Sequence, residues 1–483
     1  MPELKNKDLL REACLVDGRW IGTPKIEVTN PATGELVGRV PEFAADEAKQ
    51  AVEAAAKALK SWSGKTAKER STVLRAWFDL ILANKEDLAV IMTREQGKPL
   101  AESRGEIEYA AGFIEFYAEE AKRLYGETIP SPWPGSRILV LRQAAGVVSA
   151  ITPWNFPAAM ITRKVGPALA AGCTAVVKPA TATPFTALAL GVLAEKAGVP
   201  AGVLNIVTGK SGPIGEVLTT HEAVRVVTFT GSTEIGKALM KQAAEGVKKV
   251  GLELGGNAPF LVFDDADVDA AVAGAIQSKF RNMGQTCVCA NRIYAQDGIY
   301  DAFVEKLAAA VKKLKVGNGL EEGVTQGPLI NEDAVEKVED HIADALAKGA
   351  KLELGGKRHA LGGSFFEPTV LSHVTQDMKI AREETFGPVA PVFRFTTEEE
   401  AIAYANATEF GLASYFYARD VGRIFRVAEG LDYGIVGVNS GAISTEVAPF
   451  GGVKQSGIGR EGSRHGVEEF TELKYVLLGG LQA

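Results

Sequence analysis

The chain has 483 residues, 46% of them hydrophobic and 23% charged, and its formal net charge is −7 at pH 7. This composition is typical of a folded globular protein and excludes a disordered scaffold. Because the net charge is negative, no global positive field attracts nucleic acid or an anionic membrane, and we expect neither as a partner.

Composition and the first residues also bear on the cellular compartment. No apolar run is long enough to span a membrane, and the charged first residues, "MPELKNKDLLREAC", have no apolar segment typical of a secretory signal. The four cysteines are too few and too widely spread for a disulfide framework. We therefore expect a protein of a reducing, cytoplasmic compartment.

Two α/β domains are predicted in chain order. Residues 45–123 have apolar side chains at spacings of three and four, which predicts helices. From residue 145 onward, short apolar strands such as "AGVVSAIT", "TAVVKPA" and "VRVVTFTG" alternate with helices over 184–198 and 233–246. This alternation predicts a doubly wound parallel sheet. We assign residues 1–127 and 146–254 to this first domain.

The second series begins with the strand "APFLVFDD". A helix over 267–281, the strand "NRIYAQ" and helices over 299–315 and near 331–348 follow, and the Gly-rich "LGGKRHALGGSFF" reads as a surface loop. These elements predict a second α/β domain over 255–450. The sequence contains no internal repeat and no low-complexity tract.

Two strand-like segments, 128–145 and 466–483, lie more than 300 residues apart. Neither can form a core alone, so we assign both to a sheet that joins copies of the chain. We expect a homo-oligomer, either a dimer or a tetramer.

Ligands of parallel sheets bind beyond the carboxyl ends of the strands, so the loops there are the candidate site. "FTGSTEIG" places Gly231 and Ser232 before a helix, where free N–H groups suit a pyrophosphate; the alternative is a plain turn with a helix cap. "VVKPATATP" ends a strand with Lys178, which either extends to solvent or reaches a ribose or phosphate oxygen.

Two further loops carry groups suited to catalysis. Asn155 in "ITPWNFP" is either a turn residue or a fixed N–H donor for an oxyanion. Glu253 in "LELGGN" lies in an apolar strand, where a carboxylate must be paired, solvated or raised in pKa, and the two following glycines allow close approach. A structural ion pair is the alternative for Glu253.

Cys287 and Cys289 in "GQTCVCAN" are separated by one residue. Without histidines or a second cysteine pair nearby they do not supply a zinc site, and C-x-C is not the C-x-x-C of thiol exchange. A nucleophile at Cys287, or two buried inert cysteines, are the remaining interpretations.

Taken together and in this order, "PWNFP", "KPA", "FTGSTEIG", "LELGGN", "GQTC" and "EETFGP" resemble the aldehyde dehydrogenase superfamily, from about residue 10 to the C-terminus. The stretches "AMITRKVGPALAAGC", "SKFRNMGQTCVCANR" and "EVAPFGGVKQSGIGREGS" are similar to its succinate-semialdehyde dehydrogenase branch, with the glutarate-semialdehyde dehydrogenases next. The resemblance implies a Rossmann-type cofactor domain, an α/β catalytic domain and a small β oligomerisation segment. It also implies NAD(P)-dependent oxidation of succinic semialdehyde to succinate.

The resemblance also implies roles for single residues. Cys287 would attack the aldehyde, the Asn155 amide and the Cys287 N–H would hold the oxyanion, and Glu253 would activate the water that hydrolyses the thioester. The implied cofactor contacts are Trp154, Asn155, Lys178, Pro179, Ala180, Thr181, Gly231, Ser232, Leu254 and Glu384. The implied anchors for the substrate carboxylate are Arg163, Arg281 and Ser444.

One position bears on the choice of cofactor. NAD-preferring relatives commonly carry a glutamate three residues after the lysine, where this chain has Thr181. A carboxylate there would repel a 2′-phosphate, whereas Thr181 can donate a hydrogen bond and Lys178 can attract the charge. We therefore expect NADP to be preferred, with NAD also possible.

Two rival functions remain open at this level. One is a catalytically silent nucleotide-binding or structural homologue, and the other is an acylating enzyme that passes the thioester to coenzyme A. The presence of Cys287, Glu253 and Asn155 argues against both. Cys289 is either a bystander or the partner of Cys287 in a reversible, strained disulfide that stops turnover.

Overall fold

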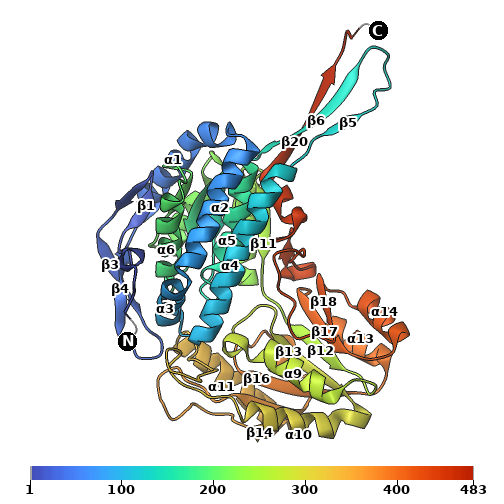
Figure 1. Ribbon diagram of the computed structural model, residues 1–483. Coiled ribbons are helices and arrows are strands. Elements are labelled where there is room, and N and C mark those ends of the chain that lie inside the picture. The colour runs from blue at the N-terminus through green and yellow to red at the C-terminus, as the bar shows by residue number, and fades with distance from the viewer. Residues whose placement is uncertain (1–2, 482–483) are drawn as a thin grey trace.

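Two largely parallel sheets form the body of the protein, and a narrow arm projects from it (Figure 1). The structure, a computed structural model, describes residues 3–481. Residues 1–2 and 482–483, the outer ends of the predicted segments 1–127 and 466–483, lie outside the described residues.

The first sheet has eight strands in the order β19-β11-β10-β7-β8-β9-β1-β2. In chain order these are β1 (Cys14–Val16), β2 (Arg19–Ile21), β7 (Val147–Ile151), β8 (Thr174–Lys178), β9 (Leu204–Ile206), β10 (Val224–Thr230), β11 (Lys249–Glu253) and β19 (Gly457–Ile458). Strands β7 to β11 pair in parallel, as predicted, whereas β1, β2 and β19 pair antiparallel at the edges. Because β8 and β10 lie on opposite sides of β7, the strand order reverses at β7 and β10, where such sheets bind ligands.

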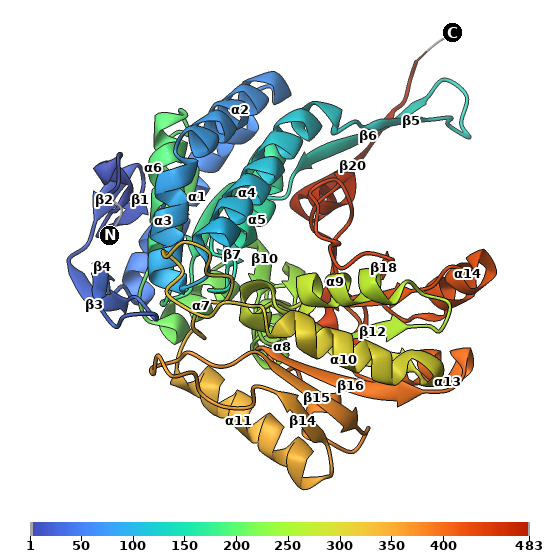
Figure 2. The ribbon, with the colours of Figure 1, turned by 60° about the horizontal axis from the view of Figure 1, so that its bottom comes forward.

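Helices cover both faces of this sheet (Figures 1 and 2). They are α1 (Ala45–Ser63), α2 (Ala67–Ala83), α3 (Lys85–Gln96), α4 (Leu100–Glu120), α5 (Ala159–Ala171), α6 (Pro184–Lys196), α7 (Ser211–Thr220) and α8 (Thr233–Ala244). The predicted helices over 45–123 and near 184–198 and 233–246 are therefore confirmed.

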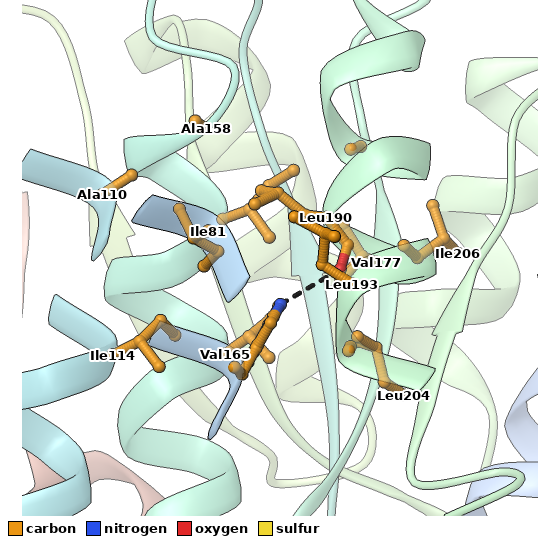
Figure 3. Close-up of a cluster of buried hydrophobic side chains, with 14 of the residues drawn as sticks. Ile81, Ala110, Ile114, Ala158, Val165, Val177, Leu190, Leu193, Leu204 and Ile206 are labelled. Carbon is orange, nitrogen blue, oxygen red and sulfur yellow. Dashed lines mark hydrogen bonds between the residues drawn. The ribbon is translucent and has the colours of Figure 1, made fainter. Parts of the chain in front are cut away.

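The strands are apolar throughout because both faces are buried. Val177 belongs to the core formed with α2, α4, α5 and α6, whereas its neighbour Val176 belongs to the core on the α1 and α7 side. Figure 3 shows part of the first core, where Ile81, Ile114, Val165 and Leu190 converge from four helices.

The second sheet has seven strands in the order β14-β15-β16-β13-β12-β17-β18, all parallel except β14. They are β12 (Ala258–Val262), β13 (Ala290–Gln296), β14 (Lys351–Leu354), β15 (Thr369–Val374), β16 (Val389–Phe395), β17 (Ala413–Tyr417) and β18 (Ile435–Val438). Its helices are α9 (Val268–Lys279), α10 (Tyr300–Val311), α11 (Glu332–Ala347), α12 (Lys379–Arg382), α13 (Glu398–Asn406) and α14 (Val421–Gly430). The division at residues 254 and 255 falls between β11 and β12, and as a domain boundary it stays a prediction.

Some predicted helices end earlier than expected. The helix expected over 299–315 is α10 and ends at Val311. The helix expected over 267–281 ends at Lys279, and a 3-10 turn, η3 (Arg281–Gly284), follows. Within this turn Asn282 and Met283 have φ of 49° and 56°, in the left-handed region that an α-helix cannot contain. Arg281 therefore lies on the loop that leads to Cys287 and not on the helix.

The arm consists of β5 (Glu127–Ile129), β6 (Arg137–Ala144) and β20 (Thr471–Leu478), and Figures 1 and 2 show it extending away from the body. Strands β6 and β20 pair antiparallel from Ala144 opposite Thr471 to Arg137 opposite Leu478. The two segments predicted to share a sheet thus do so, although residues 464–470 form a 3-10 helix and not a strand. Leu473, Tyr475 and Leu477 of β20 are exposed.

Across residues 3–481, no helix has the length and apolar character that crossing a membrane requires.

Candidate active site

A cavity of 360 Å³ lies where the loops after β7 and β10 face the second sheet. Seven residues predicted for catalysis or cofactor binding line it, namely Trp154, Asn155, Gly231, Ser232, Leu254, Cys287 and Glu384. They come from five separate stretches of sequence, and the fold brings these together at the point where the strand order of the first sheet reverses.

Cys287 is half-buried, whereas the other three cysteines are buried. Burial raises the pKa of its thiol to about 12, and nearby Glu384 and Glu253 add to this rise, while the positive charge of Arg163 opposes it. The thiol is therefore protonated at neutral pH. The carbonyl of Cys287 lies 2.4 Å from the position that a Cβ on Gly256 would occupy, so the glycine pair of "LELGGN" allows the catalytic loop to pack here.

Asn155 is buried, and its Nδ2 donates to the backbone carbonyl of Gln285 at 3.0 Å. This contact fixes which end of the amide carries the N–H groups. Since an amide nitrogen has two hydrogens, the second is left for an oxygen in the cavity. An oxyanion donor at Asn155 is compatible with this arrangement and stays a prediction.

Glu253 ends β11 and is 4% exposed. Burial raises its pKa well above the usual range, Glu461 adds to the rise, and Arg163 and Lys164 oppose it. Its Oε2 has no hydrogen-bond partner among the described residues. Glu253 does not line the 360 Å³ cavity, but its charge lies close enough to raise the pKa of the Cys287 thiol.

The groups expected to hold a cofactor differ in their surroundings. Ser232 caps α8 by accepting from the Ile235 N–H at 3.4 Å, and Glu384 accepts from the Gly256 N–H at 3.1 Å. Lys178 is 4% exposed, and burial lowers its pKa to about 8. No ion pair within residues 3–481 includes Lys178, whose Nζ donates to the carbonyl of Pro179. A buried ammonium without an anion fits an anionic ligand such as a nicotinamide dinucleotide.

The rest of the "KPAT" turn lies outside this cavity. Pro179, Ala180 and the exposed Thr181 follow β8 and precede α6, and none of the three lines the 360 Å³ cavity. Their cofactor contacts stay predictions.

A second cavity, of 180 Å³, is lined by Arg281 and Ser444, and also by Thr286 and Val288 on either side of Cys287. The Arg281 guanidinium stands 4.8 Å from the centroid of the Phe156 ring. Arg281 is absent from the ion pairs that residues 3–481 form. The catalytic loop therefore separates a cavity lined by predicted cofactor contacts from one with an unpaired arginine.

Arg163 has a different environment from Arg281. It is 1% exposed, its Nε meets a carboxylate oxygen of Glu461, and its guanidinium lies 4.0 Å from the centroid of Phe450. It lines neither cavity. Its Nη2 has no hydrogen-bond partner among the described residues. A contact between Arg163 and the substrate stays a prediction, and Glu461 is a competing partner.

Sequence reasoning missed several residues that line the larger cavity. Lys337 on α11 is one, and Phe386, whose ring meets Trp154 edge to face at 5.7 Å, is another. Phe386 lies within "EETFGP", so the motif pointed to its region. Lys337 is on the exposed face of an amphipathic helix, where nothing in the sequence distinguishes it from a solvated lysine.

Comparison with known protein families shows which family the chain belongs to. Residues 20–476 match the profile of the aldehyde dehydrogenase family. The chain belongs to the aldehyde dehydrogenase family. The resemblance carried by the six motifs is thus confirmed, and the protein is an enzyme of the oxidoreductase class.

Three similar aldehyde dehydrogenases carry different substrate names. A glutarate-semialdehyde dehydrogenase of Pseudomonas aeruginosa is 63% identical, covering 99% of this chain and 100% of the relative. A 3-sulfolactaldehyde dehydrogenase of Pseudomonas putida is 62% identical, covering 100% of both chains. The NADP-dependent succinate-semialdehyde dehydrogenase of Escherichia coli is 61% identical, covering 99% of this chain and 100% of the relative.

Solved structures show the same fold. The succinate-semialdehyde dehydrogenase of Burkholderia pseudomallei, 61% identical, superposes with a TM-score of 0.98 over 99% of this chain and 100% of that one. An NADP-dependent enzyme of Escherichia coli, 60% identical, gives the same TM-score and coverage. The predicted α/β aldehyde dehydrogenase fold is confirmed.

Cys289 has a partner that the sequence did not indicate. Its Sγ lies 3.2 Å from Nζ of Lys279, which is 0% exposed and also donates to Oδ1 of Asn291 at 3.1 Å. Among residues 3–481 no three His, Cys, Asp or Glu side chains are grouped to hold a metal ion. Cys289 is therefore a hydrogen-bonding group of the loop, and whether it is a bystander in catalysis stays a prediction.

The disulfide switch between Cys287 and Cys289 stays a prediction, and the Lys279 contact determines the variant that tests it. We expect Cys289→Ser to keep both polar partners of Lys279, whereas Cys289→Ala leaves Asn291 as its remaining hydrogen-bond partner and costs about 1–3 kcal/mol. If the switch exists, reductant restores activity after peroxide treatment in the unchanged enzyme but not in Cys289→Ser. Equal recovery in both would exclude it. Thermal unfolding of the two variants checks the hydrogen bond separately.

Proposed function

We propose that the protein oxidises a semialdehyde acid to the dicarboxylate, with succinic semialdehyde as its main substrate and NADP preferred over NAD. The observation that carries the proposal is the position of Cys287 between the two cavities. The cofactor residues lie on one side of it, and the unpaired guanidinium of Arg281 lies on the other. The NADP-dependent succinate-semialdehyde dehydrogenase of Escherichia coli supports this choice.

The chemistry follows from the residues around Cys287. The Cys287 thiol passes its proton through water to the Glu253 carboxylate, which releases it to solvent before the later hydrolysis. The thiolate then forms a bond to the aldehyde carbon, and the Asn155 amide with the Cys287 N–H stabilises the resulting oxyanion. When bound, the nicotinamide supplies the acceptor for the hydride that leaves this carbon. The product on Cys287 is a thioester. The raised pKa of Glu253 suits it to take a proton from water, which attacks the thioester, breaks the C–S bond and releases the carboxylic acid.

Of the residues that would hold the cofactor, Lys178 with Thr181 would contact the adenosine ribose, and the turn of Gly231 and Ser232 would contact the pyrophosphate. Trp154, Leu254 and Glu384 would surround the nicotinamide riboside. Pro179 and Ala180 would contact the cofactor through the same turn as Lys178.

The cofactor preference gives a direct prediction. A carboxylate in Thr181→Glu would bind ribose hydroxyls but repel a 2′-phosphate, so we expect the ratio of kcat/KM with NADP to that with NAD to fall about tenfold or more. Steady-state kinetics with both cofactors measures it, with Thr181→Gln as the isosteric neutral control. An unchanged enzyme that uses NAD as well as NADP would contradict the NADP preference.

The substrate is the point on which the relatives differ. The experiment is a steady-state comparison of succinic semialdehyde, glutaric semialdehyde and 3-sulfolactaldehyde with both cofactors. One methylene is worth about 1–3 kcal/mol, so the preferred chain length should show as a roughly 10- to 200-fold difference in kcat/KM. A higher kcat/KM for either rival would replace succinic semialdehyde in the proposal.

The other predicted properties have their own tests. Absence of reduced nicotinamide with any of these aldehydes would favour a silent homologue, and a coenzyme A thioester as product would favour an acylating enzyme. The arm supports a homo-oligomer, dimer or tetramer, because exposed Leu473, Tyr475 and Leu477 would be covered by a second copy. Sedimentation equilibrium would measure the assembly. A cytoplasmic location is part of the same proposal, and cell fractionation tests it.

A further inference from the structure

A buried lysine lies directly beneath the Asn155 turn. Lys98, between α3 and α4, is 2% exposed. Its Nζ donates to the backbone carbonyl of Asn155 at 2.6 Å and to Oε2 of Glu106 at 2.5 Å, and lies 4.1 Å from the centroid of the Phe156 ring. A positive charge is thus placed against the backbone of a residue that lines the 360 Å³ cavity together with Cys287.

Glu106 connects this charge to the far end of the same turn. Its Oε2 binds Lys98, and its Oε1 accepts from the backbone N–H groups of Ala158 and Ala159 at 2.9 and 3.3 Å, where α5 begins. The Lys98–Glu106 pair therefore holds the turn at Asn155 and again three residues later.

A second donor reaches the Asn155 carbonyl from the catalytic loop. Nδ2 of Asn282 donates to that carbonyl at 3.1 Å, and its Oδ1 accepts from Nε2 of Gln96 at 3.1 Å. The Asn282 N–H donates to Oε2 of Glu102 at 2.8 Å, which holds the residue in its left-handed conformation. The oxyanion turn and the loop that carries Cys287 are thereby joined through one carbonyl oxygen.

Stability alone is a poor reason for this arrangement. Removing a lysine and a glutamate from water is costly, and well-packed apolar residues commonly replace buried ion pairs without loss of stability. The effect of these contacts is geometric. Two donors on one carbonyl, Lys98 and Asn282, fix the peptide plane of Asn155 and with it the direction of its side chain. An amide displaced by about 1 Å stabilises an oxyanion poorly.

We propose that Lys98 and Asn282 are positioning residues for the oxidation, acting through the Asn155 carbonyl to hold the Asn155 amide toward Cys287. This inference rests on the oxyanion role proposed for Asn155. Neither Lys98 nor Asn282 lines the cavity, so both act through another residue.

Two variants test the proposal in the full-length enzyme. Lys98→Met combined with Glu106→Gln removes both charges and keeps an amide oxygen for the α5 N–H groups. Asn282→Gly removes the second donor and tolerates the positive φ. In each we expect kcat to fall about tenfold or more, within the roughly 10²–10³-fold loss expected for Asn155→Ala. KM for the semialdehyde and the dissociation constant for NADP should stay unchanged.

The deciding measurement is a double-mutant cycle with Asn155→Ala. If Lys98 and Asn282 act through Asn155, their substitution in the Asn155→Ala background lowers kcat less than twofold further. The proposal would be overturned if the losses in kcat multiplied when the substitutions were combined, or if kcat were unchanged in a folded variant. Thermal unfolding shows whether each variant is folded. If the Lys98 variant does not fold, Asn282→Gly alone decides the test. If Asn155→Ala itself keeps full kcat, the oxyanion role fails instead.

Discussion

Replacing Cys287 with alanine is expected to lower kcat by at least about 10⁴-fold, because the reaction then has no sulfur to carry the acyl group. Cys289→Ser should stay within about threefold of the unchanged enzyme, since it retains a polar partner for the buried Lys279. The increase in reduced-nicotinamide absorbance on mixing with succinic semialdehyde measures both. This pair of variants thus distinguishes the roles of the two cysteines of "CVC".

Thiol labelling provides an independent check of the same assignment. Cys14, Cys173 and Cys289 are buried and Cys287 is half-buried, so a small alkylating reagent should modify one thiol per chain and inactivate the enzyme in parallel. Labelling of Cys287→Ala should be negligible. Activity retained after stoichiometric labelling of Cys287, or equal losses in the Cys287 and Cys289 variants, would contradict the nucleophile assignment.

Much of the fold was predictable because its signals are local. Helices over 45–123 show in apolar spacing, and parallel strands such as β8 and β10 are continuous apolar runs since both their faces are buried. Part of the site was predictable at the level of loops, because β7, β8, β10 and β11 are parallel neighbours whose carboxyl ends lie at the same edge of the first sheet. Cys287 and Glu384 precede β13 and β16 instead, and only their motifs indicated them. Together, seven predicted residues line one cavity.

Contacts between distant residues were not predictable. The sequence gives no sign that Arg163 meets Glu461, or that Lys98 meets the Asn155 carbonyl, because neither pair belongs to one helix or strand. The left-handed φ of Asn282 was also missed, since its neighbours continue an apparent helical pattern. Asn282 is held by distant residues, because it accepts a hydrogen bond from Gln96 and donates one to Glu102. The short strands β1 and β2 pair at a sheet edge and have too few residues to show a period.

Arg281→Ala is expected to lower kcat/KM for succinic semialdehyde about 30- to 100-fold, mainly by raising KM. This factor corresponds to about 2–2.7 kcal/mol, which lies within the roughly 1.5–3 kcal/mol that a hydrogen bond to a charged group contributes. Arg281 lines the 180 Å³ cavity beside Cys287. Its charge acts on the buried Glu102, but Arg281 forms no ion pair within 4 Å among the described residues, so its guanidinium has hydrogen-bond donors for the substrate. Steady-state kinetics of the purified variant provides the measurement.

The matched control is an aldehyde of the same length without the carboxylate, butanal. Since butanal has nothing to offer the guanidinium, its kcat/KM should be unchanged or higher in Arg281→Ala, and selectivity for the acid over butanal should fall by the whole factor. Arg281→Lys keeps the charge but loses the planar fork, so it should recover part of the selectivity. Equal losses for both aldehydes would mean that Arg281 supports the catalytic loop and does not bind the substrate; Arg163, despite its pairing with Glu461, would then be the remaining candidate anchor.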